Sequence, residues 1–168
     1  PVYAPHRFAS VGRALATVPV AAAALGAVAG LPAVRLVSSH YSVMSRATAQ
    51  VLVGGPALVE RALGQRVSKD ELGGPELHGS SGVIDDVVDD EAAAFAAIRR
   101  FLAYMPQNVW ELPPVVPSGD SRDRREEKLA SIVPTNRRRV FDMRAVIRAI
   151  LDLDSFFEIG RGHGAGQI

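Results

Sequence analysis

The side chains that usually carry out catalysis are few in this sequence, and their spacing does not form a site. The four histidines, His6, His40, His78 and His163, stand far apart, and the chain has no cysteine. The His-x-Glu and His-x-x-x-His patterns of zinc sites are absent, as are a nucleophile elbow and a P-loop. We therefore predict neither a metal site nor a catalytic nucleophile.

Another kind of active site needs no reactive side chain at all. Backbone N–H groups at a turn can stabilise a developing oxyanion while a cofactor supplies the base. Such a turn needs small residues between a strand and a helix, and Gly26-Ala-Val-Ala-Gly30 has that composition. We predict that Ala27–Pro32 is a turn at which the backbone approaches a ligand closely.

A cluster of acids is the remaining candidate site, and it has two interpretations. The acids could bind a cation, but around the start of a helix they are more often a solvated cap, where the helix dipole favours negative charge. We favour the cap. The cluster consists of Asp85, Asp86, Asp89, Asp90 and Glu91.

The elements that would position the turn alternate between strands and helices. The predicted strands are the continuous apolar run Val18–Leu25 and the shorter segments Tyr41–Met44, Gln50–Val53 and Ser81–Asp85. The predicted helices are Pro56–Leu63 before Gly64, a short turn behind the capping box Ser68–Glu71, a helix after Asp89 that buries Phe95, Ile98, Leu102 and Met105, and Met143–Leu151 behind Asp142. This alternation predicts an α/β fold.

Composition excludes several classes of protein. With 168 residues, 48% of them hydrophobic, and a net charge of +1, the chain is neither disordered nor basic enough to attract nucleic acid. The 21 uncharged residues between Arg13 and Arg35 could be a membrane span or a signal peptide. Because they are rich in alanine and include Pro19, we favour a buried strand and helix, and we expect no membrane partner.

Several longer stretches resemble a known family, the carboxyltransferase (β) subunits of biotin-dependent acyl-CoA carboxylases. The similarity runs from about Val11 to Ile168. The most specific stretches are Glu71-Leu-Gly-Gly-Pro-Glu-Leu-His78 and Leu102-Ala-Tyr-Met-Pro-Gln-Asn108, and others are Ser39-His-Tyr-Ser-Val-Met44, Gly54-Gly-Pro56 and Ser81-Gly-Val-Ile-Asp85.

The resemblance implies a crotonase-like or Clp-protease-like superhelix, of which this chain matches a middle portion. It implies that segment 1–105 is the later part of the N-terminal half. Segment 106–135 would then be a proline-rich, charged connector, and 136–168 the start of the C-terminal half. In this family carboxybiotin, carried by a partner subunit, gives up its carboxyl group, and the freed biotin takes the α-proton of the acyl-CoA. Backbone N–H groups hold the thioester oxygen.

Carried over by position, the resemblance assigns the backbone donors to Gly30, Leu31 and Ala33, and substrate binding to Ala29, Gly54 and Gly55. Many family members have a second glycine where this chain has Leu31 and Pro32. Because proline has no N–H group, Pro32 cannot be a donor. The second oxyanion hole, for biotin, would lie beyond Ile168, so we expect the chain alone to be inactive.

The resemblance also implies partners and a location: a biotin carboxylase and biotin carrier (α) subunit, further copies of the same chain, and the cytoplasm or, in a eukaryote, the mitochondrial matrix. Two alternatives remain open. The chain could be a catalytically incompetent assembly element, which Pro32 favours. It could also be a crotonase-type hydratase or isomerase, but that chemistry normally needs nearby carboxylates, and the region from Arg13 to Arg66 contains only Glu60.

Overall fold

The computed structural model describes residues 7–164, so the outer ends of the expected segments 1–105 and 136–168 lie outside the described residues. The elements along this part of the chain are α1 (Arg7–Leu15), β1 (Ala21–Ala24), β2 (Ala27–Ala29), α2 (Leu31–Val37), β3 (Tyr41–Ser45), β4 (Gln50–Leu52), α3 (Pro56–Leu63), α4 (Lys69–Gly73), α5 (Pro75–Ser81), β5 (Asp86–Val88), α6 (Glu91–Leu102), α7 (Leu129–Ile132) and α8 (Met143–Ile150).

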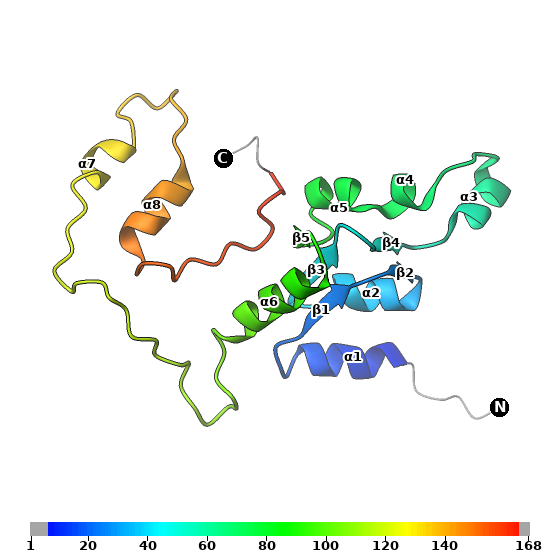
Figure 1. The fold of residues 1–168 in the computed structure, drawn as a ribbon, viewed down its shortest axis with the longest axis horizontal. Coiled ribbons are helices and arrows are strands. Elements are labelled where there is room, and N and C mark those ends of the chain that lie inside the picture. The colour runs from blue at the N-terminus through cyan, green and yellow to red at the C-terminus, as the bar shows by residue number, and fades with distance from the viewer. Residues whose placement is uncertain (1–6, 165–168) are drawn as a thin grey trace.

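All strand pairs in the described residues are parallel. One sheet has the order β1-β3-β5, with Ala21 opposite Tyr41 and Val43 opposite Asp86. The other pairs β2 with β4. At least one helix lies in the chain between the two members of each parallel pair, as parallel connections require, so the predicted α/β class is confirmed (Figure 1). The strands predicted within Val18–Leu25, Tyr41–Met44 and Gln50–Val53 are also confirmed.

Two of the predicted local structures are wrong. The predicted turn Ala27–Pro32 contains a strand, β2, and the first residues of α2, because its small side chains allow the backbone to extend and pair with β4. The predicted strand Ser81–Asp85 begins at the end of α5, which Gly82 ends with a left-handed φ of 74°. The strand in this region, β5, starts at Asp86, one residue after the end of the predicted strand.

The helix ends follow the sequence closely. Gly64 ends α3 with a left-handed φ of 68°, and Ser68 and Glu71 form the predicted capping box of α4. The carboxylates of Asp90 and Asp142 accept hydrogen bonds from backbone N–H groups in the first turns of α6 and α8. These short-range signals depend only on neighbouring residues, which is why they can be predicted from sequence.

Two apolar clusters form the core, one on each side of the β1-β3-β5 sheet. The first joins Leu36 of α2 and Met44 of β3 to Val51 of β4. In the second, Phe101 of α6 packs on the fully buried Tyr41 with ring centroids 5.1 Å apart. The predicted buried face of α6 is therefore partly wrong: Ala94 and Phe101 are buried, whereas Phe95 and Leu102 are more than 40% exposed.

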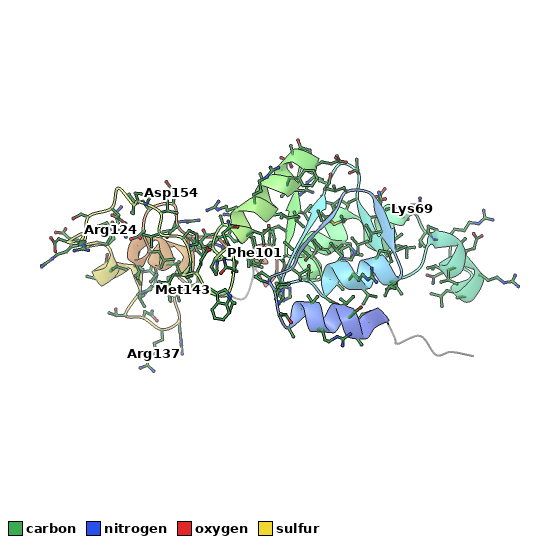
Figure 2. All side chains as sticks on the ribbon, turned by 90° about the horizontal axis from the view of Figure 1, so that it is seen from below. Lys69, Phe101, Arg124, Arg137, Met143 and Asp154 are labelled. Carbon is green, nitrogen blue, oxygen red and sulfur yellow. The ribbon has the colours of Figure 1, made fainter. Side chains whose placement is uncertain are left out.

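The chain beyond α6 leaves the sheet and returns to it. The connector after Met105 is extended except for α7, which contacts α8, and Arg137 points away from the rest of the chain (Figures 1 and 2). Residues 152–164 then run back to α6, where the Tyr104 hydroxyl donates to the backbone oxygen of Ser155 and Arg100 donates to that of Phe156. The ring of Phe157 meets Tyr41 edge-on.

The alanine-rich stretch between Arg13 and Arg35 is divided among several short elements. It forms the end of α1, then β1, β2 and the first half of α2, and Ala24 and Ala33 are buried. The expected strand and helix are therefore present, but only part of each is buried. Among residues 7–164, every helix is too short or too polar to cross a membrane.

The corrected face of α6 gives a matched pair of substitutions. Phe101→Ala should lower the free energy of unfolding by about 3–5 kcal/mol, because it removes a buried ring that contacts Tyr41. Phe95→Ala makes the same change on the exposed face of the same helix and should cost less than about 1 kcal/mol. Urea denaturation of both variants tests this, and equal losses would contradict the assignment of the faces.

Candidate functional site

The β2–β4 pair brings the residues predicted for substrate binding to one edge. Ala29, the last residue of β2, lies opposite Leu52, the last residue of β4. Because the strands are parallel, the segments that follow them leave from the same edge. Gly30 with the start of α2, and the segment that carries Gly54 and Gly55, therefore both begin at this edge.

Gly30 joins β2 to α2 in a conformation that few other residues adopt. Its φ is 64° and its ψ is −131°, although a β-carbon there would meet no atom within 4 Å. Its N–H group donates to the backbone oxygen of Leu52 at 3.1 Å, which extends the ladder between the two strands. This N–H group therefore already has a partner in the fold, whereas the sequence predicts it as an oxyanion donor. The donor role of Gly30 stays a prediction.

The two other predicted donors lie in the first turn of α2, where N–H groups have no partner within the helix. Pro32 lacks an N–H group, and no side chain caps this helix. The first residue of α2 whose N–H bonds back to the turn is Val34, which donates to the backbone oxygen of Gly30 at 3.1 Å. Within residues 7–164, the N–H groups of Leu31 and Ala33 therefore have no hydrogen-bond partner.

Gly54 and Gly55 differ in the space that surrounds them. A β-carbon on Gly54 would lie 2.5 Å from Cδ2 of Leu58, whereas one on Gly55 would meet nothing within 4 Å. Gly55 is the N-cap of α3 in an extended conformation. Gly55 therefore leaves room at the start of α3. The binding role of Ala29, Gly54 and Gly55 stays a prediction.

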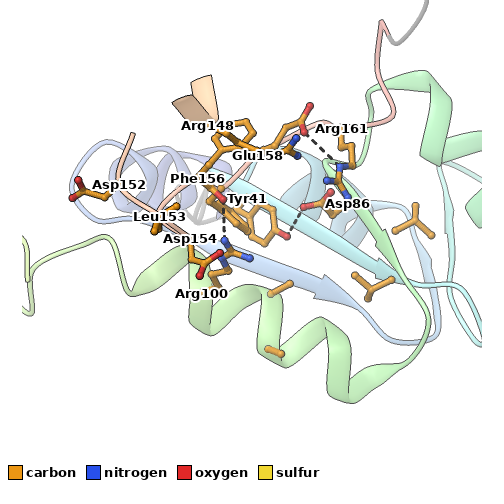
Figure 3. Close-up of a pocket in the computed structure, with 15 residues that line it drawn as sticks. Tyr41, Asp86, Arg100, Arg148, Asp152, Leu153, Asp154, Phe156, Glu158 and Arg161 are labelled. Carbon is orange, nitrogen blue, oxygen red and sulfur yellow. Dashed lines mark hydrogen bonds and ion pairs between the residues drawn. The ribbon is translucent and has the colours of Figure 1, made fainter. Parts of the chain in front are cut away.

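A cavity of about 620 Å³ lies between β5, α6 and the returning segment 152–161, away from the β2–β4 edge. Tyr41, Asp86, Arg100 and Glu158 are among the residues that line it, and the Tyr41 hydroxyl donates to Oδ2 of Asp86 at 2.7 Å (Figure 3). Sequence analysis missed this cavity because its walls come from segments that are far apart in the chain.

The carboxylates of Asp85 and Asp86 are held inside the fold, which corrects their assignment to a solvated helix cap. Asp85 accepts hydrogen bonds from the N–H group and the hydroxyl of Ser42, both at 2.8 Å. Burial raises the pKa of Asp86 above its usual value, and the charge of Asp85 adds to the effect. Burial also raises the pKa of Tyr41. The cap interpretation holds for Asp90, which accepts the N–H group of Ala93, and for the exposed Glu91 in the first turn of α6. No three candidate metal ligands converge within residues 7–164.

Comparison with known proteins identifies relatives over most of the chain. The family model described as the carboxyl transferase domain matches residues 6–168. The carboxyltransferase subunit of propionyl-CoA carboxylase from Haloferax mediterranei is 36% identical over 143 residues, which are 84% of this chain and 28% of that protein. The biotin-dependent long-chain acyl-coenzyme A carboxylase β4 subunit from Mycobacterium tuberculosis is 34% identical over 90% of this chain and 29% of its own length.

Solved structures show the same similarity. Transcarboxylase 12S, solved as a hexamer assembly with hydrolysed methylmalonyl-coenzyme A bound, superposes with a TM-score of 0.85 at 28% identity, over 94% of this chain and 31% of its own. This likeness confirms the expected crotonase-like fold. The chain thus spans less than a third of the length of the relatives it matches.

Gly30→Ala tests the strained conformation at the start of α2. A β-carbon has room there, so the cost comes from the backbone conformation and should be about 1–3 kcal/mol of unfolding free energy. Gly26→Ala is the control, because its β-carbon is equally unobstructed and its φ is not in the left-handed range. That variant should be neutral or stabilising by up to about 1 kcal/mol. Thermal denaturation measures both, and a harmless Gly30→Ala would count against the described turn.

The raised pKa of Asp86 predicts a pH dependence of stability. The folded chain holds this proton more tightly than the unfolded chain does. The free energy of unfolding should therefore fall as pH rises from the unfolded pKa of the carboxyl through its folded pKa. Asp86→Asn should remove that fall. Tyr41→Phe removes a donor that stabilises the carboxylate, so it should extend the fall to higher pH.

Urea denaturation between about pH 4 and pH 8 covers this range. The profile of each variant is compared with that of the wild type. Profiles of Asp86→Asn and the wild type that run parallel at every pH would show that Asp86 is not the group responsible.

Proposed function

The chain belongs to the carboxyl transferase domain family, and from this membership we propose that it forms the acyl-CoA side of an active site that transfers a carboxyl group from carboxybiotin to the α carbon of an acyl-CoA. Within the longer subunit, segment 1–105 would belong to the N-terminal half, 106–135 to the connector and 136–168 to the C-terminal half. One observation carries the proposal: the two free N–H groups at the edge shared by β2 and β4.

The proposed carboxyl transfer requires groups that stabilise negative charge on the substrate. When the α carbon loses its proton, charge develops on the thioester oxygen, and donors aimed at that oxygen lower the barrier. The N–H groups of Leu31 and Ala33 can supply two such donors, because Gly30 is held by Leu52 and Pro32 has none. Biotin would deliver the carboxyl group and accept the proton, so no side-chain base is needed. We assign no group of the described residues to biotin.

Pro32 does not by itself make the site incompetent. Proline is favoured in the first turn of a helix, where its missing N–H group breaks no helical hydrogen bond. It lies between the two candidate donors and stiffens the turn without removing either of them. This arrangement favours a working acyl-CoA site over the alternative of an assembly element, which would not bind acyl-CoA.

The hydratase or isomerase alternative has less support. Those reactions need a carboxylate that can exchange protons with the substrate. Glu60, the acid of the region Arg13–Arg66, lies on the exposed helix α3 and forms an ion pair with Nε of Arg66 at 2.7 Å. Its carboxylate already has this partner, so we do not propose it as a catalytic base.

We also propose the partners that this chemistry requires. A biotin carboxylase and biotin carrier (α) subunit would supply carboxybiotin, and further copies of the chain would complete the assembly. Support comes from the relatives, of which one is named biotin-dependent and another was solved as a hexamer. The location would be the cytoplasm, or the mitochondrial matrix in a eukaryote.

Calorimetric titration tests the acyl-CoA site. The chain should bind an acyl-CoA more tightly than free CoA, since the thioester oxygen is what the N–H groups of Leu31 and Ala33 recognise. Equal affinities, or no binding by a chain shown to be folded, would favour the assembly alternative.

Substitution at Leu31 tests the donor itself. Leu31→Pro removes one N–H group at a helix position that tolerates proline, and in the assembled carboxylase it should lower kcat by about 10²–10³, the effect of losing one oxyanion donor. Leu31→Ala, the matched control, trims the side chain but keeps the N–H group and should stay within about threefold of the wild type. Equal losses in the two variants would assign the effect to the side chain.

A further inference from the structure

One backbone carbonyl of β4, that of Val51, is contacted by two residues of the stretch Glu71–His78. The ring nitrogen Nε2 of His78 lies 2.8 Å from this oxygen, and the side chain is only 8% exposed. Gly73 approaches the same oxygen so closely that a β-carbon there would overlap it. The spacing of Gly73 and His78 thus allows α4 and α5 to contact the same carbonyl oxygen of β4.

The contact fixes the tautomer of His78. A carbonyl oxygen can only accept, so Nε2 carries the proton, and Nδ1 of the neutral ring is then an acceptor. Nδ1 is buried and has no partner in the described part of the chain. A buried, unpaired acceptor is unfavourable, and an apolar side chain would avoid that cost. What an apolar side chain could not supply is the hydrogen bond to Val51.

The opposite edge of β4 holds the candidate oxyanion turn. Val51 lies opposite Val28, Leu52 lies opposite Ala29, and the oxygen of Leu52 accepts the N–H group of Gly30. The strand is therefore held between His78 on one edge and the turn on the other. A shift of β4 away from His78 would move Gly30 and the free N–H groups that follow it.

We propose that His78 is a positioning residue: its hydrogen bond to Val51, with the close approach at Gly73, fixes β4 and thereby the direction of the N–H groups of Leu31 and Ala33. The part that concerns these donors rests on the proposed function. The part that concerns β4 and Gly30 does not, and it can be measured without any substrate.

The test compares His78→Leu with His78→Gln. Leucine removes the donor, whereas the side-chain amide of glutamine carries its N–H at a similar reach and should restore it. Hydrogen exchange of the Gly30 amide should be at least tenfold faster in His78→Leu and within threefold of the wild type in His78→Gln. Phe101→Leu is the control, because it weakens the other apolar cluster and should leave the exchange of Gly30 unchanged relative to other core amides.

A second measurement addresses the donors. In the assembled carboxylase, His78→Leu should lower kcat at least tenfold with KM for the acyl-CoA within threefold, because donors aimed at the transition state are misplaced while binding contacts remain. His78→Gln should recover most of kcat. If His78→Leu does not fold, Gly73→Ala replaces it, since its β-carbon would push α4 away from Val51 while His78 is kept.

The outcomes separate the two proposals. Unchanged Gly30 exchange in His78→Leu, or no recovery in His78→Gln, overturns the positioning role. If the wild-type chain binds no acyl-CoA, the proposed function fails, while the exchange of Gly30 still decides whether His78 holds β4. Faster exchange of Gly30 with rescue by glutamine, together with a loss of kcat at constant KM, supports both.

Discussion

The parallel pairing of β2 with β4 is the contact on which the candidate site depends. Both strands are only three residues long, so few hydrogen bonds hold them together. The N–H group of Gly30 adds one more, to the backbone oxygen of Leu52, and so continues the ladder into the turn. This pairing determines which backbone N–H groups of the turn have a hydrogen-bond partner and which have none. An active site made of N–H groups therefore has its geometry set by strand register, since no side chain can adjust it.

From the sequence we could predict a candidate site made of backbone groups, but not which of those groups lack a hydrogen-bond partner. The lack of usable side chains and the small residues from Gly26 to Gly30 indicated a backbone site. The resemblance placed it near Ala29–Ala33. Which N–H groups are free depends on β4, some twenty residues later in the chain, and nothing in Gly30 reveals that its N–H group donates to Leu52. Hydrogen bonding between distant strands is not encoded in local pattern.

The fold shows the same division between local and distant effects. Caps at Ser68, Asp90 and Asp142 could be predicted because they involve neighbours along the chain. The buried face of α6 could not, because this helix carries apolar residues on two sides. Phe101 is buried because it packs on Tyr41, whereas Phe95 lies outside this cluster and stays exposed. The spacing of apolar residues along α6 allows either side of the helix to be buried, and tertiary contacts determine which side is.

The edge contact between Tyr41 and Phe157 has a consequence for how the chain folds during synthesis. The two rings lie far apart in the sequence, and the long extended connector between α6 and α8 must be closed before they meet. Closing so large a loop is entropically costly and slow. Until Phe157 leaves the ribosome, one side of the second apolar cluster stays open to water. The nascent chain is then exposed to aggregation for the time that it takes to make the residues up to Phe157.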